Sequence, residues 1–183
     1  MAQIIEQITQ TDIRTLIYLI PFIFLFHELE EWNILKWHRD VNTGVPDVNN
    51  FHVRLTLIFV VILNFVWTGI SLIPYSDTVM AYIIMPLIAV GILNGFQHLL
   101  WLVKFRRYAP GVIFGFFLGV PVLLYIVVRI LNENLVSPWY VILCAAAVFI
   151  SIFNTVRLKA KIDPLIGKAM VWGASVLKLL FGK

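Results

Sequence analysis

Residues 27–31 read His-Glu-Leu-Glu-Glu and directly follow the apolar run 16–26. On an α-helix, side chains three and four positions apart share a face, so His27 lies on the same face as Glu30 and Glu31. An imidazole with carboxylates at these spacings is a metal-ligand pattern that suits Zn²⁺ or Fe²⁺. Ionisable side chains are costly inside a membrane, and they usually face the interior of a helix bundle and serve a function there. The pentad therefore predicts a chemical site inside a membrane protein.

The composition predicts an all-α, polytopic transmembrane helical bundle. Of the 183 residues, 61% are hydrophobic and 13% are charged, whereas about a quarter of the residues in soluble domains are charged. The mean hydropathy is +0.91. A bilayer is crossed by about 20 residues of helix, and five apolar segments are long enough: 13–35, 54–74, 79–103, 110–131 and 138–157.

The chain is expected to divide into a bundle at 1–158 and a basic C-terminal segment at 159–183. Asp163 followed by proline is a helix-start signal and predicts a final amphipathic helix over 164–181, which we expect to lie at the membrane surface. The longest loop, 36–53, is polar, and both of its histidines, His38 and His52, are expected to face solvent.

The basic residues predict the orientation. With five spans, every lysine and arginine except Arg14 and Arg129 falls on one side of the membrane. Because that side is normally cytoplasmic, the N-terminus is expected outside and the C-terminus inside. The same asymmetry explains the basic pI of about 9.3, so no nucleic-acid partner is inferred.

Polar side chains from other spans are expected at the depth of the pentad. The third span runs in the same direction as the first, which brings Asn94, Gln97 and His98 to its cytoplasmic half. The fifth span brings Asn154 to a similar depth. Asn94 and His98 are one helical turn apart, so Asn94 is placed to orient His98 or to bind a ligand.

These positions predict a metal site formed by His27, Glu31 and His98, with Glu30 as a fourth or bridging ligand. Glu30 and Glu31 are the expected catalytic carboxylates, and Glu30 could instead act as a general base beside a metal-bound water. Glu28 is directed about 100° away from His27 and is the weakest ligand candidate. The alternative is that the pentad is only the solvated end of the first span.

Two further patterns surround the third and fourth spans. Arg106, Arg107 and Tyr108 lie in the turn between them, where the arginines can anchor to anionic headgroups or clamp the phosphate of a lipid-like substrate. Glycines four residues apart, at 91 and 95 and again at 111, 115 and 119, predict close contact between the two helices.

The chain resembles the HXXEE family of uncharacterised bacterial membrane proteins. The resemblance rests on the pentad at 27–31, on the second histidine at His98, and on the Tyr-Ala-Pro-Gly turn at 108–111. It extends over roughly 20–115 and implies a functional site at these residues, in a bacterial inner membrane. The family has no established activity, so the resemblance implies no reaction.

The sequence therefore favours a membrane-embedded metal-binding protein. We expect a metal-dependent enzyme of the hydrolase or oxidase type, which acts on a lipid-like or amphiphilic substrate from the cytoplasmic half of the bilayer. One alternative is a carrier for protons or cations that uses the same carboxylates. Another is haem bound between His27 and His98. A structural or immunity-type protein is also compatible, as is a homo-oligomer in contact with membrane lipids.

Overall fold

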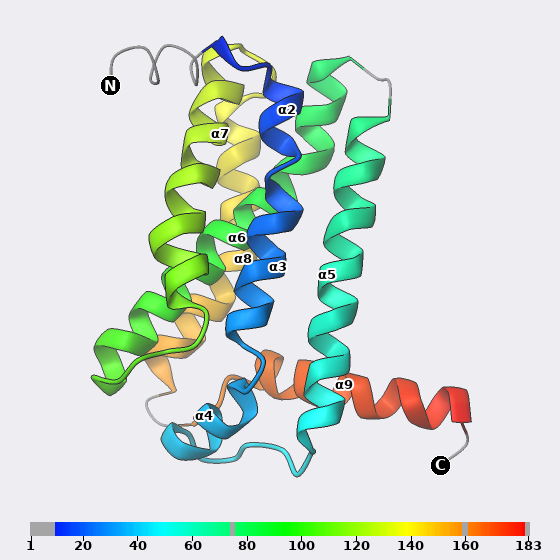
Figure 1. The fold of residues 1–183 in the computed structure, drawn as a ribbon. Coiled ribbons are helices and arrows are strands. Elements are labelled where there is room, and N and C mark those ends of the chain that lie inside the picture. Colours follow the sequence, from blue (N-terminus) through cyan, green and yellow to red (C-terminus); the bar gives the residue numbers. More distant parts are fainter. Residues whose placement is uncertain (1–9, 74–75, 159–160, 182–183) are drawn as a thin grey trace.

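The computed structural model describes residues 10–73, 76–158 and 161–181, and most of them are helical. Five rods run side by side along the bundle: α2 and α3 in succession, α5, α6, η1 continued by α7, and α8 (Figure 1). The short α4 and the long α9 lie together at one end, which we call the α9 end (Figure 1). The bounds are α2 Ile13–Ile17, α3 Ile20–Glu30, α4 Ile34–Val41, α5 Asn50–Leu72, α6 Asp77–Phe105, η1 Val112–Gly119, α7 Val120–Asn132, α8 Pro138–Arg157 and α9 Pro164–Phe181.

The helical membrane-protein class is confirmed, and three of the five expected spans are clear in the described residues. Among the described residues, three helical segments are long and apolar enough to cross a bilayer: Asn50–Leu72, Asp77–Phe105 and Val112–Asn132. The helix α8 has the bounds expected of the fifth span, and its described apolar part includes Pro138–Ala147.

The first expected span, 13–35, is interrupted in two places. The helix breaks between Ile17 and Ile20, because Pro21 in the first turn of α3 has no amide hydrogen for the carbonyl of Ile17. It ends again at Glu30, well before residue 35. The pentad therefore occupies the last turn of α3, and its final residue, Glu31, is the C-cap.

The helix α4 corrects the expectation of a loop over 36–53. Ile34, Leu35 and His38 form its buried face, at the spacing of an amphipathic helix. His38 is only 1% exposed, so the prediction that it faces solvent is wrong. Its ring lies edge-on to Trp101, and its Nδ1 accepts a hydrogen bond from the Asn42 side-chain amide at 2.8 Å.

Burial lowers the pKa of His38 to about 4, against a smaller upward effect of Glu31. His38 is therefore neutral at physiological pH. His52, the other loop histidine, lies inside α5 and is partly buried.

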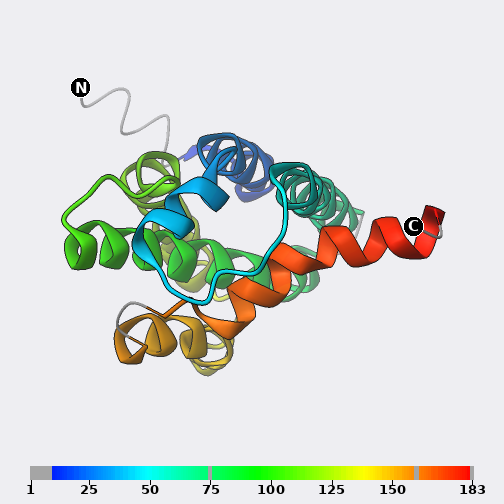
Figure 2. The same cartoon turned by 90° about the horizontal axis from the view of Figure 1, so that it is seen from below.

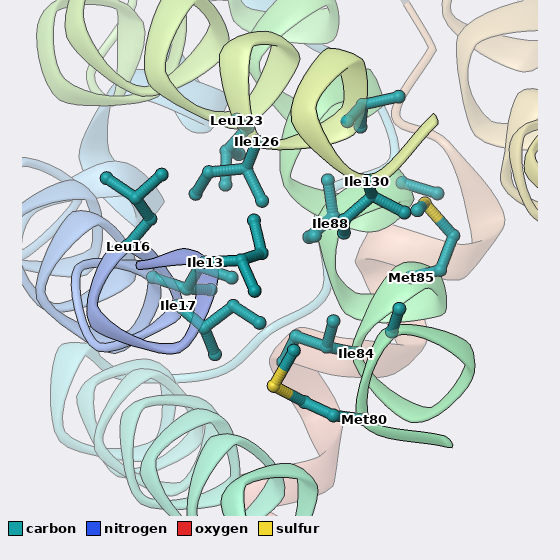
Figure 3. Close-up of a cluster of buried hydrophobic side chains, with 14 of the residues drawn as sticks. Ile13, Leu16, Ile17, Met80, Ile84, Met85, Ile88, Leu123, Ile126 and Ile130 are labelled. Atoms are coloured by element: carbon teal, nitrogen blue, oxygen red, sulfur yellow. The ribbon is translucent and has the colours of Figure 1, made fainter. Parts of the chain in front are cut away.

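Two hydrophobic clusters leave a polar layer between them. The larger cluster joins α2, α3, α6 and α7, with Ile17, Ile84 and Ile126 fully buried at its centre (Figure 3). The smaller cluster, at the α9 end, includes Ile34 of α4 and Met170 of α9. Along α3 the last buried member of the larger cluster is Phe24, so the pentad falls between the two clusters.

The predicted close contact of the glycine-containing helices is confirmed at Gly95 of α6 and Gly115 of η1. A Cβ atom on Gly95 would lie 2.7 Å from the carbonyl oxygen of Gly115, which is too close for any side chain. Small residues at this spacing let helix backbones approach each other in lipid. The crossing brings the start of η1, at Gly111, against α3 and α6.

The final helix has the predicted bounds, and its start is capped as expected, because the Leu165 amide donates to Asp163 Oδ1 at 2.8 Å. It lies across the end of the bundle (Figures 1 and 2). It crosses α5 closely: Thr56 Oγ1 donates to the Ala169 carbonyl at 3.2 Å, and a Cβ on Gly173 would overlap the His52 carbonyl. That α9 lies at the membrane surface stays a prediction. Its direction across the end of the bundle agrees with that prediction.

Candidate metal centre

Three predicted ligands meet in the polar layer. His27 and Glu31 come from the last turn of α3, and His98 comes from α6. Glu31 Oε1 lies 2.8 Å from His98 Nε2 and 3.6 Å from His27 Nε2. All three ligand atoms lie within 4.8 Å of one another, and the histidines are 3% and 1% exposed. We call these three residues the His–Glu–His cluster.

The hydrogen bonds of His27 leave Nε2 as the lone-pair nitrogen. Its Nδ1 lies 3.1 Å from the Gly111 carbonyl, which can only accept a hydrogen, so Nδ1 carries the proton. The Asn94 side-chain amide then donates to Nε2 at 2.8 Å. This tautomer follows from the hydrogen-bond network. An Nδ1–H bond to a backbone carbonyl is how metal-binding histidines are usually oriented. Asn94 thus orients His27 and not, as the sequence suggested, His98.

The absence of a side chain at Gly111 leaves room for the two imidazoles to pack together. The rings of His27 and His98 meet edge to face, with centroids 4.8 Å apart. A Cβ on Gly111 would lie 2.6 Å from Cε1 of His27 and 2.7 Å from Cε1 of His98, and its φ is +91°. Both the space and the left-handed backbone require glycine. His98 Nδ1, on the same side, is buried and has no hydrogen-bond partner among the described residues.

Glu30 lies outside the cluster, contrary to the expectation that it acts as a ligand or general base. Its carboxylate accepts hydrogen bonds from the Tyr108 hydroxyl at 2.5 Å, the Ile113 amide at 3.1 Å and the Phe114 amide at 2.8 Å. These amides are free donors at the start of η1, and a helix N-terminus favours a carboxylate. Glu30 therefore fastens η1 to α3, a positioning role.

Tyr108 serves the same contact. Partial burial and the hydrogen bond to Glu30 raise the pKa of its hydroxyl above the usual value, so it stays a donor at physiological pH. The Tyr108 carbonyl accepts from the Trp37 indole at 2.8 Å. The turn at 108–111 is thus tied both to α3 and to α4.

A cavity of about 190 Å³ lies beside the cluster. Glu31 and His98 reach its wall, together with Asn94 and Gln97 of α6. Residues of α3, α4, α5, α6 and α9 line it, and α9 contributes Ile166, Ala169 and Met170. A ligand on the open side of the cluster would therefore enter a space that α9 covers.

Two residues that the sequence reasoning missed also line this cavity. Glu28 was expected to point away from the site, but it is only 7% exposed and lies on the cavity wall. The spacing of three residues to Glu31 was the available signal, because it places both carboxylates on one face. His38 is the second, and its signal was the apolar spacing of α4.

The other predicted site residues lie elsewhere. Arg106 and Arg107 are exposed and belong to no wall of the cavity, so the geometry does not support a phosphate clamp over the cluster. Arg106 ends α6 with a left-handed φ of 49°. The side chain of Asn154 lies outside the described residues.

Comparisons with known proteins place the chain in a family. No curated protein matches it, and no solved structure matches it. A family model described as "protein of unknown function with HXXEE motif" matches residues 18–126, more than half of the chain. The match includes the pentad, His98 and the turn at 108–111, which are the residues that build the cluster and its support. The protein belongs to the HXXEE-motif family.

Proposed function

We propose that the protein binds a divalent transition metal, Zn²⁺ or Fe²⁺, at His27, Glu31 and His98, and that it is a metal-dependent enzyme of the membrane. The observation that carries this proposal is the convergence of three ligand atoms within 4.8 Å in the buried layer of the bundle. Two histidines and one carboxylate are the donor set both of hydrolytic zinc enzymes and of non-haem iron oxygenases.

The distances from Glu31 to the two histidines suit such an ion. With bonds of about 2.0–2.1 Å, two ligands of a tetrahedral zinc are about 3.3 Å apart. The Glu31 oxygen lies 2.8 and 3.6 Å from the two histidine nitrogens, so both distances need to change by only a few tenths of an ångström. The Asn94 amide, which now donates to His27 Nε2, would release that lone pair.

Three protein ligands leave a coordination position open, as in catalytic zinc sites. The bound ion would supply Lewis acidity with activated water, or oxygen chemistry if it is iron. The protein's own residues hold the ligands in place and shield the position with α9. We propose a lipid-like or amphiphilic substrate, because the cavity lies inside a membrane bundle, and an orientation with the α9 end in the cytoplasm.

The second candidate is a proton- or cation-coupled carrier. It is favoured by Glu28, a further buried carboxylate on the cavity wall. Haem is a poorer fit, because axial imidazoles must lie on opposite faces of a porphyrin. The two rings here are 4.8 Å apart, with the Glu31 carboxylate at both Nε2 atoms.

The test is the metal content of protein purified without chelators, measured by elemental analysis. We expect about one equivalent of zinc or iron, lost in His27→Ala and His98→Ala and retained in His52→Ala, a matched change at a histidine outside the cluster. A wild-type protein without metal would contradict the proposal. Cation or proton flux in liposomes by such metal-free protein, abolished in Glu31→Gln, would favour the carrier.

A further inference from the structure

A second hollow meets the cavity from the side of the bundle. It is a groove of about 220 Å³ between α3 and α5. It is lined by Leu25, Glu28, Leu29, Trp32, Leu57, Ile58, Val61 and Ile62. The outer residues Leu29, Ile58 and Ile62 are exposed on the apolar surface of the bundle, so the groove opens where lipid chains lie. Glu28 and Leu57 line both hollows.

Glu28 is the polar group at this junction. Its carboxylate is more than nine-tenths buried, and no hydrogen bond joins it to another side chain or amide in the described part of the chain. The carboxyl group is thus free to take a hydrogen-bond partner from a ligand in the hollows that it lines. A ligand that brings a donor to the junction would satisfy it.

The charge of the two hollows restricts that ligand. Glu28 and Glu31 both line the cavity, and neither hollow has a lysine or arginine among its described lining residues. Arg54, at the end of the groove, lies over the Trp32 ring and donates to the Trp32 carbonyl and to Asn33. No lysine or arginine among the described lining residues is therefore available to pair with an anionic head group at the junction.

We propose that the groove and the cavity together bind a single-chain amphiphile, with its alkyl chain in the groove and a small hydrogen-bond-donating head, a hydroxyl or an ammonium group, at Glu28. The inference rests on the proposed function, since it names the substrate class of the metal centre. An alkyl chain gains little from the groove, because the surrounding lipid is equally apolar. Selectivity must come from the head group and Glu28.

The experiment measures adducts by native mass spectrometry, after the protein in phosphatidylcholine nanodiscs is equilibrated with 1-decanol, decylamine, decyl phosphate or decanoate. We expect adducts with decanol and decylamine and none with the two anions. Adducts with decyl phosphate or decanoate as abundant as those with decylamine would overturn the inference.

Three variants locate the ligand. Val61→Trp fills the groove and should abolish the adducts, whereas Val66→Trp, the same change at an exposed position of α5 outside the groove, should keep them. Glu28→Gln should weaken decylamine binding about tenfold and decanol binding less, because a charge-assisted hydrogen bond is lost. Wild-type affinity in Val61→Trp would refute the groove as the chain site.

Metal analysis of every variant separates the two proposals. We expect the metal content to be unchanged in Val61→Trp and Glu28→Gln. Metal without any adduct would refute this inference and leave the metal centre standing. Adducts that Val61→Trp abolishes, in a wild-type protein without metal, would support the amphiphile site and refute the metal centre.

Discussion

Gly111→Ala should both destabilise the protein and empty the metal centre. The new Cβ would lie 2.6 Å from His27 Cε1 and 2.7 Å from His98 Cε1, so at least one ring has to move. Overpacking of this kind costs about 1–3 kcal/mol. The left-handed φ of +91° adds about 1–2 kcal/mol for a residue with a Cβ. The expected loss is therefore about 2–5 kcal/mol.

The assay is equilibrium unfolding in mixed micelles, followed by circular dichroism, together with the metal content of the folded fraction. Gly69→Ala is the matched control, because a Cβ at Gly69 meets nothing within 4 Å and alanine is favoured in a helix. It should be neutral or slightly stabilising and keep its metal. If Gly111→Ala were as stable as the wild type and retained metal, the packing of Gly111 against both imidazoles would be refuted.

Three other substitutions test the support of the cluster. Asn94→Ala should not weaken metal binding, because the Asn94 amide donates to the Nε2 lone pair of His27 that the ion would take, and a competitive chelator titration that shows a clear loss of affinity would contradict this reading. Glu30→Ala should cost about 1–3 kcal/mol of unfolding free energy, since it leaves donors of η1 unpaired, while metal stays bound; loss of metal with no loss of stability would instead make Glu30 a ligand. Gly173→Val should undock α9 from α5, because its Cβ would overlap the His52 carbonyl, and faster proteolysis within 164–181 is the expected sign; an unchanged cleavage rate would exclude this tight crossing.

The cluster itself could be predicted because helical periodicity and span direction determine it. His27 and Glu31 share a face at any helix bounds, and parallel first and third spans place His98 at their depth. Helix starts such as Asp163 before proline are equally local signals. The glycine spacing of α6 and η1 also predicted a contact, since only small residues permit it.

The role of Glu30 could not be predicted, because its partners at 113 and 114 lie more than eighty residues along the chain. By their spacing from His27, Glu30 and Glu31 are equally good candidates for metal ligands. Only the position of η1 shows which of the two is a ligand candidate in the structure. Glu28 was misjudged because its direction was measured from His27 alone, whereas α5 contributes a second, largely apolar wall on its side. The helix α4 was not predicted because most of its residues are polar and its buried face is only about one turn long.

The metal centre is tested most directly by X-ray absorption spectroscopy of the purified wild type and of His98→Ala. The wild-type spectrum should show nitrogen and oxygen ligands at about 2.0–2.1 Å, with the outer-shell scattering of two imidazoles. The variant should lose one imidazole or the ion altogether. Sulfur ligands, a wild-type sample without metal, or spectra that do not differ between the two proteins would contradict a site formed by His27, Glu31 and His98.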